Sequence, residues 1–147
     1  MPGLGIAAIA AAPTLLQVGS GGSPETFTTI SNVDNIKITS KTKVIDVTSH
    51  STGIPWTQQF PTIRSAGDLS HDIFWVPEDP THSSTTNGLR YLWENATLKD
   101  WQLIYPDGNS STDAYQGYVT QMSPTSKVGD VLRMSVMISL TGKPSLV

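Results

Sequence analysis

The histidines of this sequence, with the carboxylates and hydroxyls beside them, are the side chains that could perform catalysis. His50 and Ser51 follow Asp46, so they supply the residue types of a Ser-His-Asp triad. No nucleophile-elbow motif accompanies them, and nothing places the serine in a strained turn. The Gly-rich stretch GSGGS has no lysine and no helix behind it, so it is a turn and not a phosphate-binding loop. The sequence therefore predicts no catalytic residue.

A metal site is the other chemistry that these residue types could support. The histidines and the nearby Asp46 and Asp72 match no zinc or facial-triad spacing. His71 alternates into an apolar face, which indicates a half-buried structural histidine, whereas His50 and His82 are expected in solvated loop or cap positions. The chain has no cysteine, which excludes disulfides, thiolate metal sites and cysteine nucleophiles. We expect no metal, no cofactor and no enzymatic activity.

Composition points instead to association. The 147 residues suffice for one domain with a proper core. Charged residues make up 14% of the chain, below the usual share of about a quarter, and a weakly charged surface favours association. The formal net charge is −3. The one local basic cluster, Lys37, Lys41 and Lys43, is predicted to form a solvated face of a strand. High-affinity nucleic-acid binding through phosphate neutralisation is therefore disfavoured.

The N-terminal stretch, residues 1–13, is predicted to be a flexible arm of small residues that precedes a single domain at 14–147. It lacks the positively charged start of a signal peptide. No apolar run of the chain is long enough to span a bilayer. We therefore expect a soluble protein that is made in the cytoplasm.

The elements that must position these side chains are mostly strands. Leu89, Leu92, Trp93 and Ala96 form one apolar helical stripe, which predicts a single helix over 81–95. Alternating apolar residues and turn signals predict about seven short strands without βαβ alternation. The predicted fold is mainly β, an antiparallel two-sheet sandwich or open barrel with one flanking α-helix. The strands are expected at about 14–18, 27–47 (as one or two), 69–76, 101–105, 114–121 and 131–140.

A long irregular loop at about 48–68 contains the uncharged stretch TGIPWTQQFP, residues 52–61. Loops of this length are usually functional or mobile. Trp75, Trp93 and Trp101 fall on predicted core faces, which leaves Trp56 without an internal site. Two interpretations are open: the loop folds over its own core with Trp56 as a plug, or its aromatic side chains bury against a partner.

Several segments together resemble the tail tube proteins, or major tail proteins, of long-tailed non-contractile bacteriophages. The resemblance extends from about 14 to 147, and the order and spacing of the segments make it specific. The Ser/Thr-rich helix start departs from the family's pattern. The segments are TLLQVGSGGSPETFTTISNVDNI, VIDVTSHST, AGDLSHDIFWVPEDPTH, LKDWQLIYPDG and YQGYVTQMSPTSKVGDVLRMSVMISLTGKPSLV.

The resemblance implies a structural virion protein. Members of this family form a two-sheet sandwich with a flanking helix, and six copies form a ring. Rings stack into a hollow tube around a tape-measure protein, and DNA later passes through without specific binding. Tail tip and tail terminator proteins are further implied partners, and membrane insertion is not implied.

The resemblance also implies site residues. The long loop of the family contacts neighbouring subunits, and aromatic residues beside an arginine are typical interface anchors. The expected interface residues are Trp56, Gln58, Phe60, Ile63 and Arg64. Two rows could face the lumen, depending on which sheet turns inward: one is Arg133, Ser135, Met137 and Ser139, and the other includes Lys37, Thr39 and Lys41.

A monomeric β-sandwich binding module, carbohydrate-binding or adhesive, is the alternative function. It predicts an exposed aromatic platform, a ligand and a stable monomer, whereas the tail tube assignment predicts rings or tubes.

Overall fold

The computed structural model describes residues 14–22, 24–47, 56–107 and 109–146. The predicted N-terminal arm, 1–13, and His50 and Ser51 lie outside these residues. No helix in the described ranges is long and apolar enough to cross a membrane. The elements are β1 (Leu15–Gly19), β2 (Phe27–Thr29), β3 (Val33–Asp46), β4 (Gln59–Phe74), α1 (Leu89–Glu94), β5 (Lys99–Ile104), β6 (Thr112–Thr125) and β7 (Arg133–Ser145).

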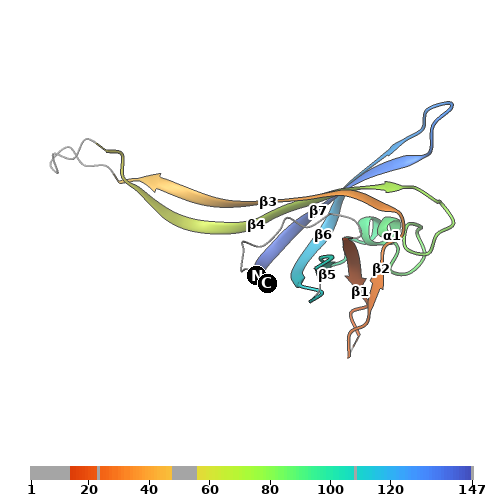
Figure 1. Cartoon of the computed structure of the whole chain (residues 1–147), viewed down its shortest axis with the longest axis horizontal. Coiled ribbons are helices and arrows are strands. Elements are labelled where there is room, and N and C mark those ends of the chain that lie inside the picture. Colours follow the sequence, from red (N-terminus) through yellow and green to blue (C-terminus); the bar gives the residue numbers. More distant parts are fainter. Residues whose placement is uncertain (1–13, 23, 48–55, 108, 147) are drawn as a thin grey trace, which may run out of the picture.

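The seven strands form one antiparallel sheet with the order β2-β1-β5-β6-β7-β4-β3 (Figure 1). The predicted mainly β, antiparallel class with one helix is confirmed. The strands are hydrogen-bonded as one sheet and not as two, because the long β6 pairs with β5 along its first half and with β7 along nearly all of its length.

The core lies on one face of this sheet. Every second side chain of β7 points into it, as the alternation predicts: Met134, Val136, Ile138 and Leu140 are buried. Leu132, predicted to share that face, precedes the strand and is exposed. Trp101 of β5 is completely buried, and its indole Nε1 donates to the backbone O of Gly117 at 3.1 Å. Burial of these apolar side chains is the main force that holds the sheet in one shape.

Helix α1 covers part of the core with Leu89 and Leu92, both buried. It is shorter than the predicted 81–95, because the Ser/Thr/Asn-rich segment before it forms turns and these residues are poor helix formers. The position before the helix requires a glycine, Gly88, because a Cβ there would lie 2.2 Å from the backbone O of Ser83. The prediction that Trp93 packs in the core is wrong, since its side chain is 51% exposed.

The predicted irregular loop at 48–68 is largely a strand, because β4 begins at Gln59. Pro61 was expected to break regular structure. It is tolerated because, among the described strands, this part of β4 has a neighbour on one side alone, so a missing N–H costs little. Gly67 has φ +82° beside a register shift of the β3–β4 pairing, where it allows the two backbones to approach closely.

We predict that Gly67→Ala destabilises the protein by about 3 kcal/mol or more. A Cβ at Gly67 would lie 1.5 Å from the backbone O of Thr39, in addition to the cost of a positive φ. Gly129→Ala is the matched control: its φ is +85°, but a Cβ there meets no described atom within 4 Å. The control should lose about 1–2 kcal/mol, the cost of the backbone conformation itself. Equal losses in urea unfolding of the two variants would contradict the close approach at Gly67.

Candidate subunit interface

The most prominent feature outside the core is the projecting end of the β3–β4 hairpin, which we call the arm (residues 41–47 and 56–65). Pairing of β4 with β7 begins at Asp68 opposite Ser139, so nine residues of β4, from Gln59 to Gly67, are not paired with β7. At about 3.3 Å per residue they reach about 30 Å. Figure 1 shows the arm running away from the rest of the sheet. An isolated two-stranded ribbon is marginally stable in water, so the arm needs support from elsewhere.

The arm exposes large apolar side chains on both of its faces. Cross-strand partners share a face, so Ile45 and Phe60 lie on one side while Val44 and Pro61 lie on the other. Trp56 is 75% exposed, Ile63 68% and Phe60 59%. Several exposed large apolar side chains gathered on one element are typical of protein–protein contact surfaces.

Four of the five predicted interface residues are exposed on the arm: Trp56, Phe60, Ile63 and Arg64. The fifth, Gln58, is half-buried, and its backbone O accepts a hydrogen bond from the N–H of Val47 at 2.9 Å. The exposure of Trp56 contradicts the alternative in which it plugs its own core. Sequence reasoning missed Val44, Ile45 and Val47, which are also exposed. The consecutive Val44 and Ile45 and the nearby Val47 were assigned to a strand at 27–47 and not to the interface.

Charge is distributed unevenly between the arm region and the remainder of the chain. The arm carries three basic side chains, Lys41, Lys43 and Arg64, against one carboxylate, Asp46. The rest of the sequence has six basic side chains and eleven carboxylates. The arm is therefore a basic, apolar projection from an acidic protein.

Apart from Lys41, the two predicted lumen rows lie on one face of one sheet, so they are not alternatives. Ser139 pairs with Asp68, which pairs in turn with Thr39, and Met137 reaches Lys37 through Ser70 in the same way. Arg133, Ser135, Met137 and Ser139 all point away from the core. Lys41 follows a register shift in β3 and belongs to the arm. We call this side of β3, β4, β6 and β7 the polar face.

Hydrogen bonds between hydroxyls and carboxylates order the polar face. Ser135 Oγ donates to Asp72 Oδ1 at 2.9 Å, and Ser139 Oγ lies 3.4 Å from Asp68 Oδ1. The guanidinium of Arg133 sits over the ring of Phe74, 4.9 Å from its centroid. These contacts satisfy the polar atoms within the subunit and present a hydrophilic surface.

The described histidines are structural. His82, predicted to be solvated, is buried: its Nδ1 accepts from the N–H of Val76 at 3.2 Å and its Nε2 donates to the backbone O of Ser31 at 2.6 Å. His71 is 1% exposed, and neither ring nitrogen has a hydrogen-bond partner among the described residues. Burial, with a smaller contribution from His82, lowers the pKa of His71 to about 4, while Asp72 acts in the opposite direction.

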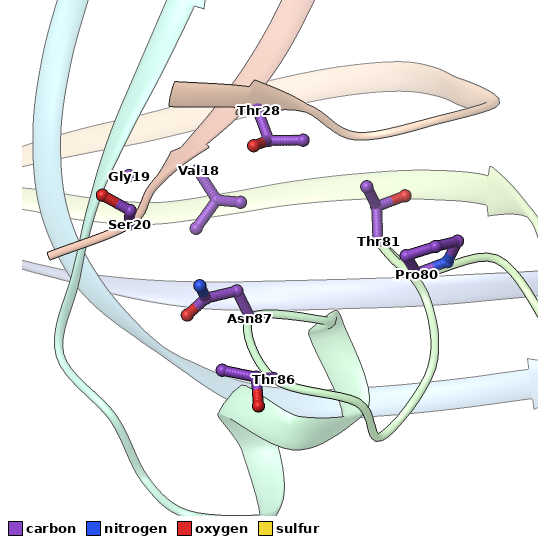
Figure 2. Close-up of a pocket in the computed structure, with 8 residues that line it drawn as sticks. All are labelled: Val18, Gly19, Ser20, Thr28, Pro80, Thr81, Thr86 and Asn87. Atoms are coloured by element: carbon purple, nitrogen blue, oxygen red, sulfur yellow. The ribbon is translucent and has the colours of Figure 1, made fainter. Parts of the chain in front are cut away.

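Nothing in the described ranges resembles a catalytic or metal centre. No group of three or more potential metal ligands occurs there. A small hollow lies between β1, β2 and the segment that leads into α1, where Val18, Thr28, Thr81 and Asn87 line it (Figure 2). None of its lining residues has an ionisable side chain, so the hollow offers no side chain that could act as a general acid or base.

Chains with the same fold occur in solved structures of tail and baseplate assemblies. The chain is similar to one from the tail of an empty gene transfer agent (GTA) particle, refined with C6 symmetry: TM-score 0.76, 16% identity, covering 95% of this chain and 99% of that one. It is also similar to the SPP1 tail tube protein (TM-score 0.73, 8% identity, 95% and 80% covered). A third is a chain of the anti-feeding prophage baseplate (TM-score 0.68, 7% identity, 98% and 97% covered). A search of curated protein sequences finds no significant match.

A curved antiparallel sheet with a projecting apolar arm and no catalytic centre in the described ranges defines a self-associating structural subunit. The particular family follows from the sequence: residues 17–147 match the model described as "Lambda phage tail tube protein, TTP". The chain belongs to this family. It is a structural tail tube component of the virion, not an enzyme, and the family resemblance read from its segments is confirmed.

Burial of His71 predicts acid sensitivity. The pKa of His71 in the folded chain, about 4, lies below the ordinary histidine value of 6.5, so the unfolded chain binds a proton that the folded chain does not. The stability that depends on neutral His71 is complete above pH 6.5 and is lost as the pH falls towards 4, by about 3 kcal/mol. His71→Leu should flatten the urea-unfolding stability profile between pH 4 and 6.5. An unchanged slope in this variant would assign the acid sensitivity to the carboxylates instead.

Proposed function

We propose that six copies of this chain form a ring and that rings stack into the tail tube through which DNA leaves the particle. The exposed apolar arm carries the proposal, since its surface has no place to be buried within one subunit. The C6 symmetry of the similar gene transfer agent tail supports the six-copy ring. In the ring, we propose that the curved sheet packs as the two-layer sandwich of the family.

Two strand edges support ring closure. β3 is the last strand at one side of the sheet, and at 33–45 it pairs with β4 alone among the described strands. The second half of β6, at 118–125, pairs with β7 but not with β5. Unpaired edges are templates for pairing with another chain. Because these two edges differ, contact between them is heterologous, which is the type of interface that closes a ring.

The polar face is proposed to line the lumen, with Arg133, Ser135, Met137 and Ser139 among its residues. The carboxylates of Asp68 and Asp72 on this face, hydrogen-bonded to serines, support the assignment because they repel phosphate. Phosphate contacts would retard DNA, so a conduit should make few of them.

We propose three further partners. They are a tape-measure protein inside the tube and the tail tip and tail terminator proteins at its ends.

Negative-stain electron microscopy of the concentrated, purified protein tests this function. We expect rings, or tubes with an open channel and six-fold symmetric cross-sections. A protein that stays monomeric at high concentration, and that also fails to extend tubes from purified tail tips, would contradict self-assembly.

We predict that Trp56→Ala blocks tube formation while the monomer remains folded. An exposed side chain contributes little to monomer stability, so the free energy of unfolding should change by less than about 0.5 kcal/mol. Trp93→Ala, at another exposed tryptophan, is the matched control and should still assemble. Urea unfolding and electron microscopy of both variants provide the two measurements. Loss of monomer stability in Trp56→Ala, or tubes like those of the wild type, would remove Trp56 from the interface.

A further inference from the structure

The arm joins the sheet at a β-bulge, which we call the elbow (residues 39–41 and 65–67). The pairing of β3 with β4 shifts by one residue there, so Ala66 and Gly67 of β4 lie opposite Ser40 alone. The next residue, Asp68, is where the pairing of β4 with β7 begins. The elbow therefore lies at the boundary between the sheet and the arm, where a bulge bends the strand and increases its twist (Figure 1).

The extra residue of the elbow reverses which side chains of β4 face the core. After the elbow, the buried side chains are Leu69, His71 and Ile73. Strict alternation would turn Ala66 towards the polar face, yet Ala66 is buried with the core residues. The elbow therefore also decides which side chains the arm presents on each of its faces.

Two hydroxyls and one glycine hold the elbow in its conformation. Ser40 Oγ donates to the backbone O of Ala66 at 3.1 Å, and the N–H of Gly67 donates to Ser65 Oγ at 3.0 Å. The positive φ of Gly67 and its lack of a Cβ allow β4 to pass close to the backbone O of Thr39. A bulge interrupts the hydrogen bonds between strands, and here the two serines bind backbone groups of the bulge. Contacts inside the subunit thus fix the bend.

The angle at the elbow controls where the far end of the arm lies. The part of β4 from 59 to 67 is about 30 Å long, so a rotation of about 5° at the elbow moves the far end by about 2–3 Å. Close-packed apolar contacts do not tolerate a displacement of that size. A change at the elbow would therefore misplace the exposed Phe60 and Ile63 without altering either side chain.

We infer that the elbow sets the relative orientation of the copies that the arm joins, and with it the helical twist of the tube. Ser40 and Ser65 are then positioning residues for assembly. This inference rests on the proposed function, in which the arm is a contact surface between copies. A bend that is fixed inside each subunit gives every repeated contact the same angle, and the angle of a repeated contact determines the geometry of the whole assembly.

Spin labels test the elbow in the single subunit, because the chain has no cysteine of its own. Gln59→Cys labels the far end of the arm and Gln116→Cys labels β6, and both side chains are exposed. Pulsed electron paramagnetic resonance then measures the distribution of distances between the two labels. When Ser40→Ala and Ser65→Ala are added, we expect this distribution to become about twofold broader. An equal width with and without the two hydroxyls would overturn the inference.

Thr42→Ala is the matched control. It removes a hydroxyl from the same ribbon, beside the elbow, and the Thr42 side chain has no hydrogen bond among the described residues. The distance distribution should keep its wild-type width in this variant. The single variants Ser40→Ala and Ser65→Ala, which each remove one of the two bonds, keep the test open if the double variant does not fold.

Electron cryo-microscopy of assembled tubes measures the consequence for the tube. Without the two hydroxyls rings should persist, since the apolar side chains of the arm are unchanged, but the helical twist should shift by about 5° or spread over a wider range. Thr42→Ala tubes should keep the wild-type twist. A wild-type twist in the double serine variant would overturn the inference. Absence of rings and tubes from the wild-type protein would instead count against the proposed function, and the label distances would still decide whether the serines fix the elbow.

Discussion

The continuity of β4 is the constraint on which the rest of the structure depends. Residues 68–74 lie between β3 and β7, and Leu69, His71 and Ile73 are buried there. Residues 59–67 leave that environment and have β3 as their neighbour among the described strands. One strand therefore begins in the arm and ends in the core. The direction of the arm is set by the core pairing, so burial inside the subunit orients the exposed apolar side chains of the arm.

This arrangement separates two stability requirements. The core stabilises the single subunit, because large apolar side chains are buried between one face of the sheet and α1. The arm leaves its apolar side chains in water, at a cost that only association removes. Register shifts in β3–β4 pairing and the lysines along β3 discourage indiscriminate edge pairing, as edge strands commonly require. A subunit of this kind can stay folded in isolation and still gain free energy from ordered assembly.

The sequence was a good guide where local pattern and burial agree. Alternation in β7 predicted its buried side chains, and the stripe of Leu89 and Leu92 predicted a helix that packs on the core. It failed where context overrides local preference. An irregular loop was predicted at 48–68, but an edge position tolerates the missing N–H of Pro61 and a register shift accommodates the positive φ of Gly67. His82 was expected in solvent, yet two backbone partners hold it in the interior.

The sequence by itself determined the antiparallel β class, the single helix, the absence of cysteine chemistry and the family, because these depend on residue types, periodicity and segment order. It also identified the aromatic residues of the arm as lacking an internal site. Only the tertiary structure decided that the arm is a ribbon, that the predicted lumen rows apart from Lys41 share one face, and that a β-bulge joins the arm to the sheet. Those properties depend on strand register, which is set by pairing between residues far apart in the chain.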